Sequence, residues 1–412
     1  MLHPDIQTER DRREAGPALD EAVALAAALP GLEVVGAEVV PLKSAQPGTL
    51  FGAGKLEELR ARVEAEEIGL VLIDGPVTPV QQRNLERKWK TKLLDRTGLI
   101  LEIFADRAAT REGVLQVELA ALSYQRTRLV RAWTHLERQR GGLGFVGGPG
   151  ETQIEADRRA IDEAITRLRR QLEKVTKTRA LHRAARAKVP FPVVALVGYT
   201  NAGKSTLFNR LTGAEVMAKD MLFATLDPTM RGVELSTGAK VILSDTVGFI
   251  SDLPTQLVAA FRATLEEVLE ADLIVHVRDI SHAETEEQAE DVAKILSELG
   301  VAEETPILEL WNKVDLLERE ARETAETVAA RRADVLTLSA VTGEGVDAVV
   351  AAITEALDGV RETAHLHLSF AEGRERAWLH ENRVVTGERQ DEEGWHLTVR
   401  WTPRQRDAFR RL

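Results

Sequence analysis

A buried strand pattern, a glycine-rich loop and a helical stretch follow one another directly, and this succession constrains the fold more than any other feature. The apolar run 193–197 leads into Gly198-Tyr199-Thr200-Asn201-Ala202-Gly203-Lys204-Ser205, which fits G-x-x-x-x-G-K-[ST] in the order strand, loop, helix. Backbone N–H groups of such a loop and helix can hold the α- and β-phosphates of a nucleotide. We expect Lys204 to reach the β- and γ-phosphate oxygens and the Ser205 hydroxyl to coordinate Mg²⁺. The motif predicts a nucleoside triphosphate site on an α/β domain.

The segment Asn312-Lys313-Val314-Asp315 indicates which base is bound. It follows an apolar strand pattern at 308–311 and comes after the phosphate loop. The two oxygens of Asp315 can accept the N1–H and N2–H₂ donors of guanine together, whereas adenine presents an acceptor at N1. Asn312 either contacts the O6/N7 edge of guanine or braces the phosphate loop, and the Lys313 stem can lie along the base. The pattern therefore favours GTP.

Two segments between these motifs have the order expected of γ-phosphate sensors. Ser244-Asp245-Thr246-Val247-Gly248 closes a strand pattern at 241–243, so we expect Asp245 to hold Mg²⁺ through a water and the Gly248 N–H to contact the γ-phosphate. The loop 223–229 lies between the phosphate-loop helix and that strand, where a first switch belongs. We predict Thr225 as the second Mg²⁺ ligand, with Thr229 as the alternative.

The residue after Gly248 is Phe249, where many GTPases have a glutamine that orients the attacking water. A phenyl ring cannot do this, so we expect slow intrinsic hydrolysis until a partner, a cation or a backbone group completes the site. Asn201 lies three residues before Lys204. It either helps to hold a monovalent cation such as K⁺ beside the phosphates or only shapes the loop, as asparagine often does in turns.

The predicted site is assembled from these loops. A backbone N–H of the segment 339–341 is expected to reach O6 of guanine. The residues predicted to act in catalysis are Lys204, Thr225, Gly248 and Asn201. The residues predicted to contact GTP are Gly198, Tyr199, Thr200, Asn201, Ala202, Gly203, Lys204, Ser205, Thr206, Phe223, Ala224, Thr225, Leu226, Asp227, Asp245, Thr246, Val247, Gly248, Asn312, Lys313, Val314, Asp315, Ser339, Ala340 and Val341.

Charge is distributed unevenly along the chain. The net charge is −12, yet residues 106–188 contain 18 Lys and Arg against 10 Asp and Glu. A basic segment inside an acidic protein suggests a surface that meets a polyanion, although a solvated helical face is the alternative.

The same segment has the pattern of a long helical hairpin. Apolar residues recur at a 4,3 spacing in 113–140 and again in 154–175, which predicts two helices packed as an antiparallel coiled coil. Thr152 and Glu155 have the spacing of a capping box that would begin the second helix. The glycine-rich stretch 141–150 between the helices predicts a tip, and we expect this tip to touch RNA. The residues predicted to bind RNA are Arg138, Arg140, Arg158 and Arg159.

The remaining segments predict two smaller domains. In residues 1–105, strand patterns at 34–40, 70–73 and 99–104 alternate with helical patterns at 56–66 and 80–90, which favours an α/β sheet. Gly52-Ala53-Gly54-Lys55 is interpreted as a tight turn before a helix, because Leu56 stands where a metal-binding Ser or Thr belongs. Residues 361–412 predict a small α+β domain.

We therefore predict an α/β multidomain chain. Its parts are a small N-terminal α/β domain (1–105), an antiparallel coiled-coil arm (106–188), a mostly parallel P-loop GTPase domain (189–360) and a small α+β C-terminal domain (361–412). The chain has no cysteine, which excludes disulfides and thiolate sites. No apolar run approaches the ~20 residues of a membrane span, and the N-terminus has no hydrophobic signal core. We expect a cytoplasmic monomer without membrane insertion.

Taken together, these motifs resemble the HflX family of translational GTPases. The resemblance rests on Arg138-Gln139-Arg140-Gly141-Gly142, Gly148-Pro149-Gly150-Glu151-Thr152-Gln153 and Asp157-Arg158-Arg159, together with the segments 223–229 and 245–249. It implies a Mg²⁺-dependent GTPase that binds the large ribosomal subunit and its rRNA, reaches toward the catalytic centre of that subunit with the helical tip, and splits or rescues stalled ribosomes. The alternative is a GTP-gated RNA-binding or remodelling module whose target is not the ribosome.

Overall fold

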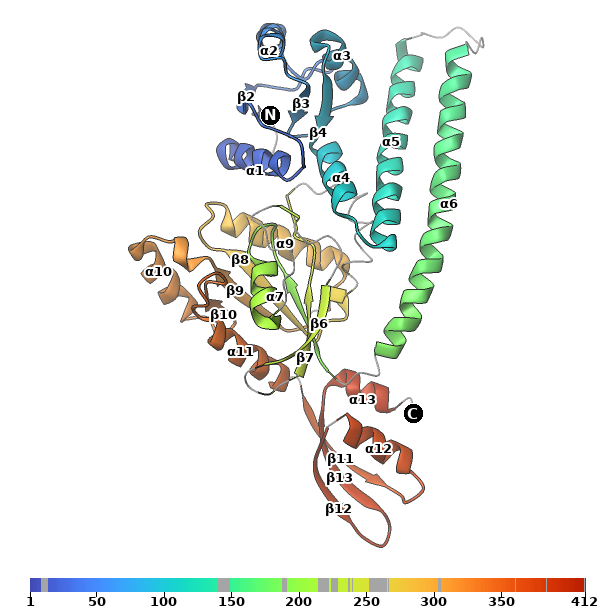
Figure 1. Ribbon diagram of the computed structural model, residues 1–412, viewed down its shortest axis with the longest axis vertical. Coiled ribbons are helices and arrows are strands. Elements are labelled where there is room, and N and C mark those ends of the chain that lie inside the picture. The colour runs from blue at the N-terminus through green and yellow to red at the C-terminus, as the bar shows by residue number, and fades with distance from the viewer. Residues whose placement is uncertain are drawn as a thin grey trace.

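The computed structural model shows four structured parts joined along one elongated chain (Figure 1). Some helical residues are described by their backbone alone. The model describes residues 1–412 with the exception of 9–13, 140–148, 187–190, 214–221, 224–228, 236, 237, 239, 252–264, 266, 303, 304, 360, 383 and 411.

The N-terminal part is a four-stranded parallel sheet in the order β2-β1-β3-β4. Thr78 begins one of its helices with a capping box that it shares with Gln81. Its strands are β1 (Leu2–Ile6), β2 (Glu38–Leu42), β3 (Leu70–Ile73) and β4 (Lys92–Asp95). Its helices are α1 (Ala15–Ala27), α2 (Ala53–Ala65), α3 (Pro79–Trp89) and α4 (Arg96–Arg107).

Helix α4 corrects one prediction, because residues 99–104 were expected to form a strand. The Asp95 side chain accepts a hydrogen bond of 2.8 Å from the Gly98 N–H and so caps the helix. Leu99, Ile100, Leu101, Ile103 and Phe104 are all buried, and Glu102 is the one exposed residue within 99–104. A short, mostly apolar run with one polar residue does not reveal its period, and it is easily mistaken for a buried strand. The strand predicted at 34–40 is also shifted, since β2 begins at residue 38.

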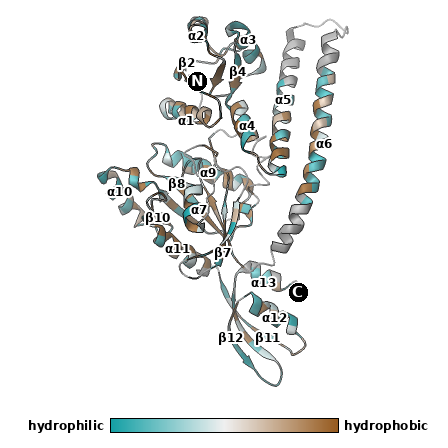
Figure 2. Ribbon diagram, in the orientation of Figure 1, coloured by the Kyte–Doolittle hydropathy of each residue, from teal (hydrophilic) through white to brown (hydrophobic). Residues whose placement is uncertain are grey.

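The arm consists of α5 (Arg111–Gln139) and α6 (Pro149–Arg186), which lie side by side and antiparallel (Figure 1). At 1.5 Å per residue the 38 residues of α6 span roughly 57 Å. Hydrophobic and hydrophilic residues alternate along α6, as expected of a helix with one packed face (Figure 2). Leu115, Ile165 and Leu168 are buried in the seam predicted from the spacing. The capping box predicted at Thr152 is wrong, because the helix already begins at residue 149.

The third part is a six-stranded sheet in the order β10-β9-β8-β5-β7-β6, parallel except for β6. Its central strand β5 is buried throughout, and β8 is buried except for its last residue, Asp279. Its strands are β5 (Val193–Val197), β6 (Thr229–Glu234), β7 (Lys240–Asp245), β8 (Leu273–Asp279), β9 (Ile307–Asn312) and β10 (Val335–Thr337). Its helices are α7 (Lys204–Thr212), α9 (Thr285–Leu299), α10 (Arg319–Ala329), α11 (Val346–Gly359) and the 3₁₀ turn η1 (Val314–Leu316).

The C-terminal part is a three-stranded antiparallel sheet in the order β11-β13-β12. It is formed by β11 (Glu362–Leu368), α12 (Gly373–Glu381), β12 (Val385–Gln390), β13 (Trp395–Trp401) and α13 (Pro403–Phe409). The predicted multidomain α/β class is therefore confirmed. Among the described residues, no helix combines the length and the apolar character needed to cross a bilayer.

Candidate nucleotide site

The phosphate loop turns sharply between β5 and α7. Gly203 immediately precedes α7 with a left-handed φ of 96°, and a Cβ atom there would overlap the side-chain amide of Asn312. Glycine meets both requirements, because it adopts positive φ readily and leaves room for a close approach. The loop therefore lies directly against the residue that begins the predicted guanine motif.

Lys204 is held inside this loop and is only 5% exposed. Its ammonium group donates hydrogen bonds to the carbonyl oxygens of Gly198 at 3.0 Å and Tyr199 at 2.7 Å. Burial lowers the pKa of Lys204 to about 8, although the nearby Asp245 carboxylate acts in the opposite direction. A cation fixed by two carbonyls beside a helix N-terminus suits the oxygens of a polyphosphate.

Two of the residues predicted to bind Mg²⁺ lie in the described part of the chain. They meet at the carboxyl ends of the parallel strands. The Ser205 hydroxyl in the first turn of α7 donates a hydrogen bond of 2.7 Å to Asp245 at the end of β7. A hydroxyl and a carboxylate are oxygen ligands of the kind that Mg²⁺ prefers. The described donor set therefore fits the ion. Thr225, the predicted second ligand of the ion, lies outside the described residues, as do Ala224, Leu226 and Asp227.

Asn312 braces the site from the end of β9. Its side-chain amide donates to the carbonyl oxygen of Ala202 at 2.7 Å, and its side-chain oxygen accepts from the Ala340 N–H at 2.9 Å. Of the two roles considered for Asn312, the structure shows the brace. Lys313, with a left-handed φ of 67°, pairs with Asp279 at 2.7 Å. Asp315 is exposed in η1, where its carboxylate can meet a ligand.

The segment 339–341 lies beside this brace and is held by a residue that the motifs did not indicate. The guanidinium of Arg210 in α7 donates to the carbonyl oxygen of Ala340 at 2.7 Å and also to that of Val341. Ser339 is fully buried, whereas Val341 is 69% exposed. Arg210 thus ties the phosphate-loop helix to the predicted base loop. No sequence motif marks this tie, because the two partners are far apart in the chain.

The segment after Asp245 pairs with the phosphate loop. The Thr200 N–H donates to the Phe249 carbonyl at 2.7 Å, and the Phe249 N–H donates to the Gly198 carbonyl at 3.1 Å. This places Gly248 beside Lys204, where a Cβ atom would lie 3.1 Å from the ammonium nitrogen. Phe249 is 1% exposed, so its ring belongs to the core and does not face the site.

Tyr199 connects the opposite side of the loop to the N-terminal sheet. Its hydroxyl donates to the Glu21 carboxylate of α1 and accepts from the Ser251 N–H at 2.8 Å. Arg96 of α4 donates to the Ser251 carbonyl at 3.0 Å, to Asp74 at 2.7 Å and to Glu21. Each of these five residues is at most 9% exposed. The buried cluster formed by Glu21, Asp74, Arg96, Tyr199 and Ser251 is called the interdomain network below.

An aromatic contact adds to this connection. Phe223 packs edge-to-face on Phe104 of α4, with ring centroids 4.6 Å apart. It has a left-handed φ of 56° and is 2% exposed. Phe223 was predicted to contact GTP, whereas its ring lies in the core shared with the N-terminal sheet.

The predicted RNA-binding arginines are only partly covered by the structure. Arg140 lies outside the described residues, and Arg138 lies where α5 is described by its backbone alone. Arg158 and Arg159 are exposed on α6, where Arg159 pairs with Glu155 at 2.8 Å and Arg158 lies 4.0 Å from Asp162.

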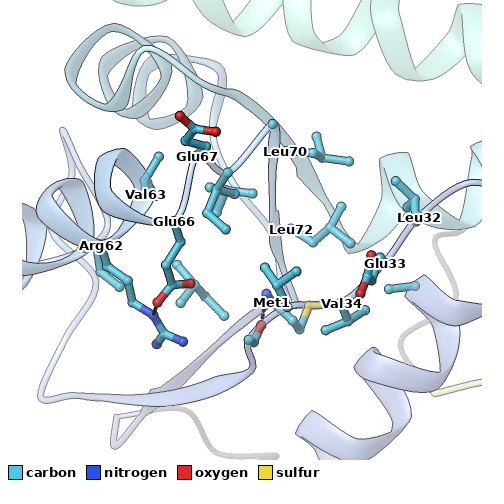
Figure 3. Close-up of a pocket in the computed structure, with 18 of the residues that line it drawn as sticks. Met1, Leu32, Glu33, Val34, Arg62, Val63, Glu66, Glu67, Leu70 and Leu72 are labelled. Carbon is cyan, nitrogen blue, oxygen red and sulfur yellow. Dashed lines mark hydrogen bonds and ion pairs between the residues drawn. The ribbon is translucent and has the colours of Figure 1, made fainter.

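A separate cavity of about 400 Å³ lies in the N-terminal sheet, bordered by α2 and β3 (Figure 3). Its lining is mainly apolar, and Arg62 pairs with Glu66 at its rim at 2.9 Å. The segment 52–55 is not among its lining residues. Only Gly52 precedes α2, and residues 53–55 form the first turn of that helix, so the segment begins a helix and the turn predicted for all of 52–55 is wrong.

A mostly parallel sheet with a phosphate loop, a hydroxyl–carboxylate pair and an N-K-x-D brace defines a P-loop GTPase. Models of protein families match along the chain: GTP-binding GTPase N-terminal at residues 17–105, GTP-binding GTPase Middle Region at 107–186, 50S ribosome-binding GTPase at 193–313 and HflX C-terminal domain at 325–412. The chain belongs to the HflX family of GTPases, and it is a GTP hydrolase.

Two relatives at high identity agree with this assignment. The chain is 52% identical to GTPase HflX of Magnetococcus marinus over 93% of its own length and 88% of the relative. It is 46% identical to GTPase HflX of Escherichia coli, over 85% and 82% of the two chains. A GTP-binding protein from Sulfolobus solfataricus, solved in complex with GDP, is similar over 87% of this chain and 99% of that one, with 25% identity and a TM-score of 0.45.

Proposed function

We propose that this GTPase binds the large ribosomal subunit in its GTP state, that its basic arm contacts rRNA there, and that GTP binding and hydrolysis serve to dissociate or rescue stalled ribosomes. The observation that carries the proposal is the arm. Two long packed helices extend well beyond the GTPase sheet (Figure 1), and their segment holds 18 basic against 10 acidic residues. Basic side chains on such a projection suit the phosphates of rRNA, and the release of counterions would drive binding.

For the nucleotide, we propose roles that follow from the placement of the described residues. Lys204 holds the β- and γ-phosphates, and the N–H groups at the start of α7 hold the α- and β-phosphates. The Ser205 hydroxyl would coordinate Mg²⁺ directly, with Thr225 as the second ligand, and Asp245 would hold the ion through a water. The ion, when bound, neutralises charge that develops on the phosphate oxygens. Gly248, already beside Lys204, contacts the γ-phosphate through its N–H.

For the base, we propose that Asp315 accepts both guanine donors while the Lys313 stem lies along the ring. Asn312 holds the phosphate loop and the segment 339–341 at a fixed separation, as its two hydrogen bonds indicate. Arg210 supports the same segment from α7.

Hydrolysis needs a group that Phe249 does not supply, because its ring is buried. We propose that the ribosome or a K⁺ ion completes the site. Asn201 has a left-handed φ of 61° and is exposed, which suits either cation binding or a purely conformational role. GTP turnover with ribosomal subunits in potassium and in sodium at equal ionic strength separates the two roles. Cation binding requires faster turnover in potassium and loss of that difference in Asn201→Ala. Equal rates would assign the missing group to the ribosome.

Co-sedimentation with ribosomal subunits tests the central proposal. The full chain should pellet with the large subunit in the presence of a non-hydrolysable GTP analogue and much less with GDP. Replacing Arg138, Arg140, Arg158 and Arg159 with Gln should weaken binding and flatten its dependence on salt, because fewer counterions are released. The matched control replaces Arg319 and Arg322, which form ion pairs on α10 outside the arm. Binding that is equal with both nucleotides, or unaffected by the arm variant at every salt concentration, would contradict the proposal and favour an RNA target other than the ribosome.

A further inference from the structure

The solvent face of the C-terminal sheet carries two histidines on neighbouring strands. His367 of β11 is paired directly with His396 of β13 in the antiparallel register. Directly paired residues project from the same face of a sheet. Both side chains are exposed, and their ring centroids lie 4.6 Å apart. Leu397 and Val399, which alternate with His396 along β13, are buried on the opposite face. The histidines are therefore available to solvent and are not part of the core of this domain.

A carboxylate from the neighbouring turn completes the group. Asp391 accepts backbone hydrogen bonds from Glu393 at 2.9 Å and Gly394 at 3.2 Å through one oxygen. Its second oxygen lies 2.6 Å from Nε2 of His396. Gly394 has a φ of 153°, and a Cβ atom there would overlap the backbone oxygen of Leu368, so glycine allows the turn to lie against the end of β11. The turn thus fixes the carboxylate beside the histidine pair.

We propose that His367, Asp391 and His396 form a binding site for a divalent transition-metal ion, with Zn²⁺ as the ion it fits. One ligand atom from each residue lies within 4.8 Å of the others. Tetrahedral coordination at zinc distances places ligand atoms roughly 3.3 Å apart. Rotation of the exposed imidazoles can close this difference.

The donor set separates this site from the nucleotide site. Two imidazoles and one carboxylate suit Zn²⁺, Ni²⁺ or Cu²⁺, whereas Mg²⁺ prefers oxygen ligands alone. Three protein ligands leave a fourth position for water or for a group from a partner. Arg389 of β12 is paired with His396 from the other side, and its positive charge opposes the metal ion. Its removal is therefore expected to increase affinity.

Calorimetric titration of the full chain with Zn²⁺ tests the site. The protein is first stripped with a chelator and then held with GDP and excess Mg²⁺ to fill the nucleotide site. We expect one equivalent of Zn²⁺ to bind, and Co²⁺ at the same site to show the visible absorption of tetrahedral coordination. His367→Gln and His396→Gln should each weaken binding at least about tenfold, since even indirect partners of metal sites contribute that much.

The variant Asp391→Asn should preserve the turn, because its amide oxygen can still accept hydrogen bonds from the two backbone N–H groups. It should also weaken Zn²⁺ binding. His365→Gln is the control, since His365 lies on β11, as His367 does, but forms a side-chain hydrogen bond with Thr398. It should leave binding unchanged, and Arg389→Gln should strengthen it. Absence of saturable Zn²⁺ binding in the unaltered chain, or equal affinity in the double variant His367→Gln/His396→Gln, would overturn the proposal.

Discussion

The two sides of the phosphate loop differ in how they are built. The side with the proposed nucleotide residues takes Lys204 and Ser205 from adjacent positions, and Asn312 reaches it from the end of β9, two strands away from β5 in the sheet. The side that faces the N-terminal sheet consists of Tyr199, held by Glu21, which lies almost two hundred residues earlier. One loop therefore serves two purposes. Its nucleotide side depends on short local motifs, and its other side depends on tertiary contacts alone.

The largest effect is expected on the nucleotide side, from Asp315→Asn. Two hydrogen bonds to a charged acceptor contribute about 1.5–3 kcal/mol each, so GTP affinity should fall by roughly two to four powers of ten. The variant should bind xanthosine triphosphate better than GTP, because the C2 oxygen of xanthine accepts a hydrogen bond that the asparagine amide can donate. Calorimetric titration with both nucleotides checks this, and unchanged GTP affinity would remove the base assignment.

A slightly smaller effect is expected in the interdomain network, from Arg96→Met. The change leaves Glu21 and Asp74 buried beside each other without their shared cation. Breaking a buried pair in this way costs about 3–5 kcal/mol of unfolding free energy. Urea unfolding measures the loss. The control is Arg60→Met, because Arg60 pairs with Glu57 on an exposed face of α2 and such pairs contribute at most about 1 kcal/mol. Equal loss in both variants would show that the network does not hold the domains together.

A smaller effect is expected when pH changes the charge of Lys204. Its pKa is lowered to about 8, so the ammonium form prevails below pH 8 and the neutral amine above it. Phosphates bind the ammonium form, and GTP affinity should therefore fall by up to about tenfold per pH unit above pH 8. Titrations at pH 7, 8 and 9 check the sign. Lys204→Arg keeps its charge over this range and should lose the dependence. A rise in affinity with pH would contradict the assignment.

The sequence predicted most of the nucleotide side because each motif there is local. Lys204, Asp245 and Asn312 follow strands that can be recognised from apolar runs, and parallel strands bring their carboxyl ends together at one edge. The long arm was predictable for a similar reason, since its apolar spacing repeats over many turns.

The other side could not be predicted, and the reason is physical. Glu21, Asp74 and Arg96 belong to no motif and lie far apart in the sequence, and only the packed fold brings them together. Helix α4 was mistaken for a strand because most residues of 99–104 are apolar and buried, in a core that includes residues of the GTPase domain. Arg210 was missed because its partners are backbone carbonyls, which carry no sequence signal.

The most direct test of the difference between the two sides of the loop compares Lys204→Met with Tyr199→Phe, measuring calorimetric GTP affinity and urea unfolding for each variant. Tyr199→Phe keeps the ring but removes the hydroxyl from Glu21 and Ser251, so it should lower the unfolding free energy by about 1–3 kcal/mol and change GTP affinity by less than about threefold. Lys204→Met should abolish most GTP affinity without lowering stability, because its burial already opposes the charged form. If Tyr199→Phe instead lowers GTP affinity as strongly as Lys204→Met while stability is unchanged, the two sides of the loop do not have separate roles.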